Sequence, residues 1–129
     1  MKKVTILFHS SGSQPVSLKC EVARSFFEKT KGLMYRSDLS ENRGILFPFL
    51  WSSYRLFWMK NVQFPLDIIF IDKAFTVRKV CEGSADSSIL HSSYWAFGFC
   101  KYVIECKRGF CQHNKISTGS IISIEKNDE

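Results

Sequence analysis

Long hydrophobic runs are missing from this sequence of 129 residues. A membrane-spanning helix needs about 20 consecutive apolar residues, whereas short stretches such as Leu66–Ile71 suit buried strands. The apolar segment Val4–Phe8 follows two lysines in the manner of a signal peptide, but it is only five residues long. We therefore expect a cytoplasmic protein without a transmembrane segment.

Paired cysteines are missing as well. The five cysteines form an odd, scattered set without a CxxC motif, which fits neither a disulfide framework nor a zinc ribbon: Cys20, Cys81, Cys100, Cys106 and Cys111. The last three, taken with His113, match no standard metal spacing. We expect free thiols, no metal and no cofactor. A nucleophile elbow, a phosphate loop and paired carboxylates are also absent, so familiar hydrolase and nucleotide-binding mechanisms lack support.

Acidic residues are few relative to basic ones. Lysine and arginine total 18 and aspartate and glutamate total 12, which gives a net charge of +6 and a pI of about 9.2. This balance favours acidic partners such as nucleic acid, anionic membrane or small phosphorylated or carboxylated molecules. The basic residues are scattered, however, and none forms a nucleic-acid-binding arm. The pattern argues against nucleic acid and favours a small acidic ligand or a protein segment.

Apolar residues are plentiful, at 45% of the chain with 12 phenylalanines, and no linker or repeat divides them. We expect a single domain over residues 1–129. Short apolar runs separated by turn residues predict strands at residues 4–8, 16–22, 45–49, 56–59, 66–71, 76–81, 102–106 and 121–124. The pattern indicates a mainly β fold bordering on α+β, as a compact β-sandwich or partly closed barrel with one or two short helices.

The helical signals are local. Ser25 stands three residues before Glu28, and this capping-box spacing predicts a short helix that begins at Phe26 and ends near Gly32. A second short helix is expected within residues 109–115.

Three segments carry a more specific pattern. The first joins Gly32-Leu33-Met34-Tyr35-Arg36 to Gly44-Ile45-Leu46-Phe47, the second joins Phe57-Trp58-Met59-Lys60-Asn61 to Pro65–Asp72, and the third is Tyr102-Val103-Ile104-Glu105. In this order and at these distances, the segments resemble the domain of unknown function family 192 (DUF192). The resemblance covers about residues 16–124.

The resemblance implies a compact, mainly β, sandwich-like fold with a small helical component, found in bacterial and archaeal proteins, and no established activity. The sequence departs from the family at Tyr94–Phe99, where relatives usually carry small residues rich in glycine and proline. A binding site bordered by this stretch would be unusually aromatic.

Turn lengths suggest how the central strands pair. A four-residue loop at residues 62–65 would place Lys60 opposite Asp67 and Trp58 opposite Ile69, and the next turn would place Phe70 opposite Val77. One face then carries the expected core residues Phe57, Met59, Ile68, Phe70, Val77 and Cys81. The other face carries Trp58, Lys60, Asp67, Ile69, Ile71, Arg78 and Val80, a mixture typical of a cleft.

We predict a ligand site centred on Trp58, Lys60 and Asp67. In this hypothesis Lys60 and Arg78 bind an anionic group, Trp58 offers a stacking surface, and Asp67 orients the ligand. The alternative is that Lys60 and Asp67 form a cross-strand ion pair while a loop or helix covers Trp58.

Three further residues support this site in the hypothesis. Arg36 and Glu105 match family positions, although they would serve equally well as a structural ion pair. Asn61 suits the transition from strand to loop, where its side chain satisfies free backbone groups, and it ranks behind Lys60 as a ligand contact.

Three functions follow from these observations. The first is a binding module that holds a small acidic ligand or a polypeptide segment on the mixed face. The second is an enzyme in which Lys60 or Asp67 acts as general acid or base, which requires a pKa displaced by burial. The third, disfavoured by the scattered charges, is nucleic-acid binding with bases stacked on Trp51, Tyr54, Trp95 and Phe97. An enclosed pocket favours the first two functions, and a flat exposed sheet flanked by basic residues favours the third.

Overall fold

The computed structural model describes residues 2–10, 12, 14–34, 36–86 and 92–126. In chain order the elements are β1 (Lys2–His9), β2 (Val16–Val22), α1 (Phe26–Lys31), β3 (Arg43–Trp58), β4 (Leu66–Ile71), β5 (Val77–Gly83), η1 (Ser92–Tyr94), β6 (Trp95–Lys107), α2 (Phe110–His113) and β7 (Ile121–Lys126). The mainly β prediction is confirmed, as are both short helices.

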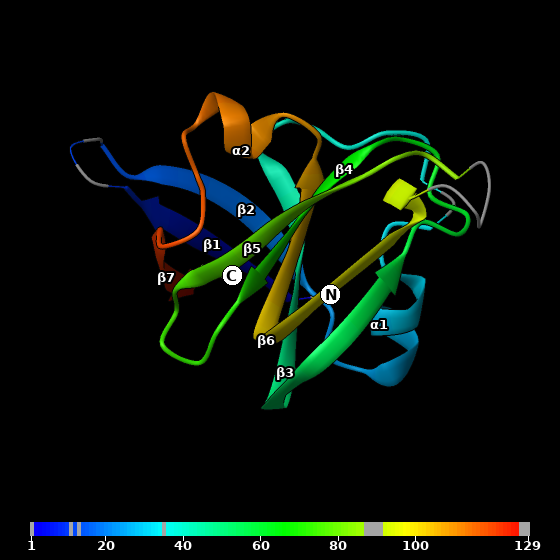
Figure 1. Cartoon of the computed structure of the whole chain (residues 1–129), viewed down its shortest axis with the longest axis horizontal. Helices are drawn as coiled ribbons and strands as arrows, with labels where there is room; N and C mark the ends of the chain where they lie inside the picture. Colours follow the sequence, from blue (N-terminus) through cyan, green and yellow to red (C-terminus); the bar gives the residue numbers. More distant parts are fainter. Residues whose placement is uncertain (1, 11, 13, 35, 87–91, 127–129) are drawn as a thin grey trace.

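All seven strands form one sheet in the order β5-β4-β6-β3-β2-β1-β7. The sheet curls until its two edges meet, where Thr76 forms a β-bridge with Ile121 and the amide of Ile122 donates to the carbonyl of Phe75. Contact is limited to this short stretch, so the sheet is a partly closed barrel (Figure 1). Curling protects the edge strands from pairing with another chain.

The two longest strands, β3 and β6, are longer than the sequence predicted. Residues 45–49 and 56–59 were expected to be separate strands, but residues 45–49 and 56–58 belong to the single strand β3, and β6 begins at Trp95 and not at Tyr102. Their pairing is interrupted between Pro48 and Ser53, where the register shifts. Both strands turn at this point (Figure 1), because an irregularity of this kind bends a strand without ending it.

Beyond the bend, residues 53–58 of β3 and 95–100 of β6 form a two-stranded ribbon. Its inner face packs on the outside of the barrel, where Phe57 contacts the rings of Phe47 and Phe70. Gly98 also faces Phe70, and a Cβ atom at this glycine would lie 2.8 Å from the ring carbon Cγ. The ribbon therefore adds a second layer, so the fold combines features of both expected architectures.

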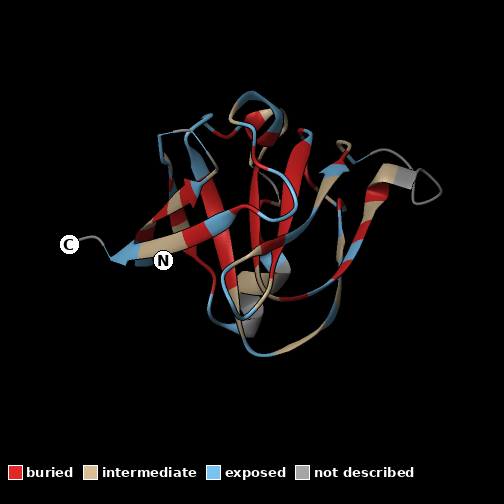
Figure 2. Cartoon of the chain, turned by 60° about the vertical axis from the view of Figure 1, so that its left-hand side comes forward, coloured by how far each residue is buried: buried red, intermediate tan, exposed pale blue. Residues whose placement is uncertain are grey.

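Two hydrophobic cores result. The barrel interior contains Ile6, Phe8, Leu18, Ile69 and Ile104, among others. The second core fills the space between barrel, ribbon and α1, and includes Leu33, Phe47, Met59, Phe70 and Val103. Figure 2 shows the buried residues concentrated along the central strands.

Helix α2 covers one end of the barrel (Figure 1). Phe110 of this helix lies edge-on to Phe8 with ring centroids 5.8 Å apart, and Cys111 is buried in the same core. Helix α1 begins with the predicted capping box, because Ser25 accepts from the amide of Glu28 while the Glu28 carboxylate accepts from the amide of Ser25.

The predicted strand registers are wrong. β3 pairs with β2 and β6, and β4 pairs with β5 and β6, so no hairpin joins β3 to β4. Asp67 therefore lies opposite Glu82 and Cys106 and not Lys60. A register shift after Phe70 places Val77 opposite Ile71, and Val77 points into the barrel core.

Candidate functional site

The side chains of the predicted mixed face separate in the fold. Asp67, Ile69 and Ile71 are buried, with the two isoleucines in the barrel core, whereas Trp58 lies on the ribbon and is 40% exposed. The ammonium group of Lys60 lies 5.3 Å from the centre of the Trp58 ring, within the range of a cation–π contact. Trp58 and Lys60 thus remain neighbours, but Asp67 does not join them.

Asp67 instead anchors α2. Its carboxylate accepts a hydrogen bond of 3.0 Å from the backbone amide of Cys111. Burial raises the pKa of Asp67, while the backbone hydrogen bonds from Cys111 and Gly109 act in the opposite direction. Because Asp67 faces α2 and Lys60 lies over Trp58, the two residues form neither the shared site predicted from the sequence nor the alternative cross-strand ion pair.

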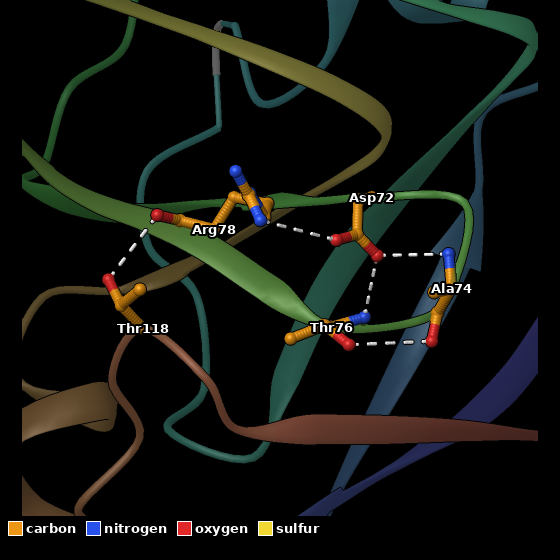
Figure 3. Close-up of polar contacts among 5 residues, drawn as sticks. All are labelled: Asp72, Ala74, Thr76, Arg78 and Thr118. Atoms are coloured by element: carbon orange, nitrogen blue, oxygen red, sulfur yellow. Dashed lines mark hydrogen bonds and ion pairs between the residues drawn. The ribbon is translucent and has the colours of Figure 1, made fainter.

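Arg78, Arg36 and Asn61 also have local structural partners. Arg78 pairs with Asp72 at 3.9 Å, and Asp72 in turn accepts from the amides of the β4–β5 turn (Figure 3). Arg36 pairs with Glu21 at 2.5 Å. Asn61 adopts a left-handed φ of 60°, and its backbone amide donates a hydrogen bond to the Oδ2 atom of the Asp86 carboxylate. The structure therefore places Arg36 and Arg78 in ion pairs away from the Trp58–Lys60 contact.

Glu105 occupies a different environment. It is 4% exposed on β6, and its Oε1 atom would lie 3.4 Å from a Cβ atom at Gly32. No hydrogen bond or ion pair to Glu105 occurs within the described residues. Burial raises the pKa of Glu105 to about 8, so the carboxyl group is largely protonated at neutral pH.

A small chamber adjoins this carboxyl group. Its volume is about 30 Å³, which is close to the space of one water molecule. The lining residues come from α1, β3, β6 and the loops between them: Lys29, Lys31, Gly32, Leu33, Met34, Phe47, Phe57, Trp58, Val62 and Glu105. We call it the Glu105 chamber. All three family-like segments contribute to it, so the specific part of the sequence converges on one place in the fold.

A larger cavity lies at the barrel end opposite α2. It has a volume of about 530 Å³, which falls in the range of small-molecule sites. Its floor consists of barrel residues such as Val22, Leu46 and Tyr102, and five cations surround it: Lys2, Arg24, Lys29, Lys101 and Lys126. We call this cavity the basic cleft. Among the described residues that line it, none carries a carboxylate.

The positive charge of the basic cleft is not balanced by ion pairs within the part of the chain that the structure describes. None of its five cations forms an ion pair with any residue that the structure describes. Burial, followed by the charges of Arg55 and Arg24, lowers the pKa of Lys29. Lys29 lies over the Phe49 ring at 4.6 Å, and Arg55 lies over the same ring at 3.8 Å. Cations held this close on an aromatic ring favour the arrival of an anion.

Sequence reasoning missed the basic cleft because its cations come from five separate segments of the chain. The net charge of +6 was the available signal, but charge alone does not say where cations gather.

One group of described residues has the donor atoms of a metal site. The ligand atoms of Asp67, Cys106 and Cys111 lie within 4.8 Å of one another, and all three residues are buried. A hydrogen bond with Cys111 and burial raise the pKa of the Cys106 thiol well above its ordinary value. The three side chains therefore form a buried cluster beneath α2.

Comparison with known proteins places the chain in a family. The DUF192 family model, described as "Uncharacterized ACR", matches residues 7–124, and the protein belongs to this family. No curated protein matches the sequence.

Two solved structures share the fold. A protein from Sinorhizobium meliloti 1021, provisionally described as a transcription regulator, superimposes with a TM-score of 0.84 at 27% identity over 95% of this chain and 93% of the other. A protein of unknown function from Novosphingobium aromaticivorans DSM 12444 superimposes with a TM-score of 0.82 at 26% identity, over 94% and 84% of the two chains. Within the described residues, helices are too short or too polar to span a membrane.

Proposed function

We propose that this protein binds a small organic anion in the basic cleft. The observation that carries the proposal is one cavity of about 530 Å³ whose described lining combines five cations with an apolar floor and contains no carboxylate. Cations alone would suit a bare inorganic ion. An apolar floor that includes Tyr102 adds affinity for a ligand with a carbon skeleton.

The open end of a β-barrel is a common position for a ligand site. Here α2 covers one end, and the other end is bordered by Lys2 on β1, Lys126 on β7 and Lys101 on β6. Because these lysines belong to strands that the closed sheet holds in place, a ligand would meet preformed charges, at a smaller entropic cost than on a mobile loop.

Calorimetric titration with two probes tests the proposal. Inorganic phosphate measures the charge contribution, and adenosine monophosphate adds a flat apolar body to the same group. We expect both to bind, with adenosine monophosphate the tighter ligand, and both affinities to fall as salt screens the cations.

The charge of Lys29 and Lys126 is removed in the variants Lys29→Met and Lys126→Met. Each is expected to weaken phosphate binding by roughly tenfold, the loss of one charge-assisted contact. The matched control is Lys19→Met, because Lys19 is exposed on β2 and does not line the cleft. Equal weakening by Lys19→Met would refute a site in the cleft.

A further inference from the structure

The outer face of the ribbon carries a continuous strip of large apolar side chains. Three cross-strand pairs make it up, namely Tyr54 with Phe99, Leu56 with Phe97, and Trp58 with Trp95. We call these six residues the aromatic strip. The Tyr54 and Phe97 rings are stacked at 5.3 Å with an interplanar angle of 9°, and the Trp58 and Trp95 rings are 5.8 Å apart.

The strip is open to solvent. Tyr54 is 65% exposed, and Phe97 and Phe99 are about half exposed, at 50% and 47%. With roughly 150–250 Å² per aromatic side chain, the exposed apolar area comes to about 500 Å². That is near the upper end of the largest patch on an ordinary monomer, and such patches are often functional.

Cations border the strip, and carboxylates are missing from its strands. Lys60 lies over Trp58, and Lys79 donates a hydrogen bond of 2.7 Å to the carbonyl of Phe97. Lys101 lies two residues after Phe99 on β6 and is one of the residues that line the basic cleft. Neither residues 42–66 nor residues 92–104 contain an aspartate or a glutamate.

We propose that the aromatic strip binds single-stranded nucleic acid, with bases stacked on Tyr54, Phe97 and Trp58 and phosphates paired with Lys60 and Lys79. Stacking on exposed rings and pairing with flanking cations are the two contacts by which proteins bind single strands without reading the sequence. The exposed ribbon face provides rings for stacking, and the cations at its borders provide partners for phosphates. The scattered basic residues argued against this partner in the linear sequence, but folding gathers some of them around the strip.

Charge favours this partner over a second copy of the chain. Two strips placed face to face would bring together two sets of cations with no carboxylate on either ribbon to compensate them. A polyanion gains from the same charges. Duplex nucleic acid is a poorer match, because its bases are already stacked on one another and unavailable to the rings.

Fluorescence anisotropy tests the proposal on the full chain, with labelled oligo(dT) and oligo(U) of about 15 nucleotides, a length that covers a site of this kind. We expect either or both strands to bind, a duplex of equal length to compete poorly, and affinity to fall steeply as salt rises from about 50 to 200 mM. Quenching of tryptophan fluorescence on binding provides a second readout, because bases would stack on Trp58.

The double variant Tyr54→Ser/Phe97→Ser removes two stacking surfaces and is expected to weaken oligonucleotide binding by roughly tenfold to a hundredfold. Its phosphate binding in the basic cleft should be unchanged, which separates this proposal from the previous one. Ile121→Ser is the matched control, because Ile121 is a 54% exposed apolar residue on β7 and not on the ribbon, and it should change affinity less than about threefold.

A third variant, Lys60→Met, keeps every ring of the strip and should reduce the salt dependence of binding. Circular dichroism establishes that the variants are folded. Undiminished oligonucleotide binding by the folded double variant would overturn the proposal. The proposal would also be overturned if the wild-type protein bound neither oligonucleotide but self-associated in sedimentation. If the double variant then lost this self-association, the strip would be an interface between copies of the chain.

Discussion

The ring of Phe70 lies directly against Gly98, so that a single added Cβ atom would approach its Cγ to 2.8 Å. Phe70 belongs to β4 in the barrel and Gly98 to β6 in the ribbon. This contact sets the distance at which the ribbon packs on the barrel, and thereby the position of the aromatic strip on its outer face.

Replacing Gly98 by alanine should destabilise the protein by about 1–3 kcal/mol, because the methyl group forces the ring and the ribbon apart. Urea unfolding measures the change. Adding Phe70→Leu to Gly98→Ala should recover part of the loss, since the smaller side chain makes room, while Phe70→Ala alone should cost about 3–5 kcal/mol. If the effects of Gly98→Ala and Phe70→Leu on the free energy of unfolding were strictly additive, the two residues would not compete for space.

The pKa of Glu105, raised by burial from 4.5 to about 8, predicts a specific pH dependence. The folded state holds this proton more tightly than the unfolded state does. The free energy of unfolding should therefore fall as pH rises from about 4.5 to about 8 and level off above, with a total loss on the order of 3–5 kcal/mol.

The variant Glu105→Gln cannot ionise and should lose this dependence, which makes it more stable than the wild type at pH 8–9. Urea unfolding across the pH range checks the result. Glu125→Gln is the control, because Glu125 is exposed and should leave the slope in place. An unchanged slope in Glu105→Gln would mean that other groups cause it.

Asp67 should be required for the docking of α2. Asp67→Ala leaves the buried amide of Cys111 without an acceptor, so we expect a loss of about 1–3 kcal/mol. Asp67→Asn retains an acceptor oxygen and should cost less. Hydrogen exchange at the Cys111 amide reports directly on the contact, and equal protection in the alanine variant would contradict this role.

The five cysteines are free thiols, as their odd number predicted, and they should differ in reactivity. Cys81 is partly exposed, whereas the other four are buried, and burial raises the pKa of the Cys20 thiol. A thiol reagent should therefore modify Cys81 first in the native protein and all five in denaturant. Peptide mapping identifies the sites, and rapid native labelling of Cys20 would contradict its position in the barrel core.

The sequence determined the local features of this protein. The bounds of β2 and β4, the capping box of α1 and the short α2 were predicted, because alternation, caps and turn residues act over a few neighbouring positions. Family membership was also readable, since it rests on motifs that are specific in order and spacing.

Only the tertiary structure decided which strands pair and which side chains meet. Turn length suggested a hairpin of β3 with β4, but β3 pairs instead, over residues 44–48 and 53–58, with β6, a strand that lies far away in the chain. That choice sent Asp67 beneath α2 and left Trp58 on an exposed ribbon. Likewise, Lys2 and Lys126 border one cleft because β1 pairs with β7, a contact between distant segments that no local pattern records.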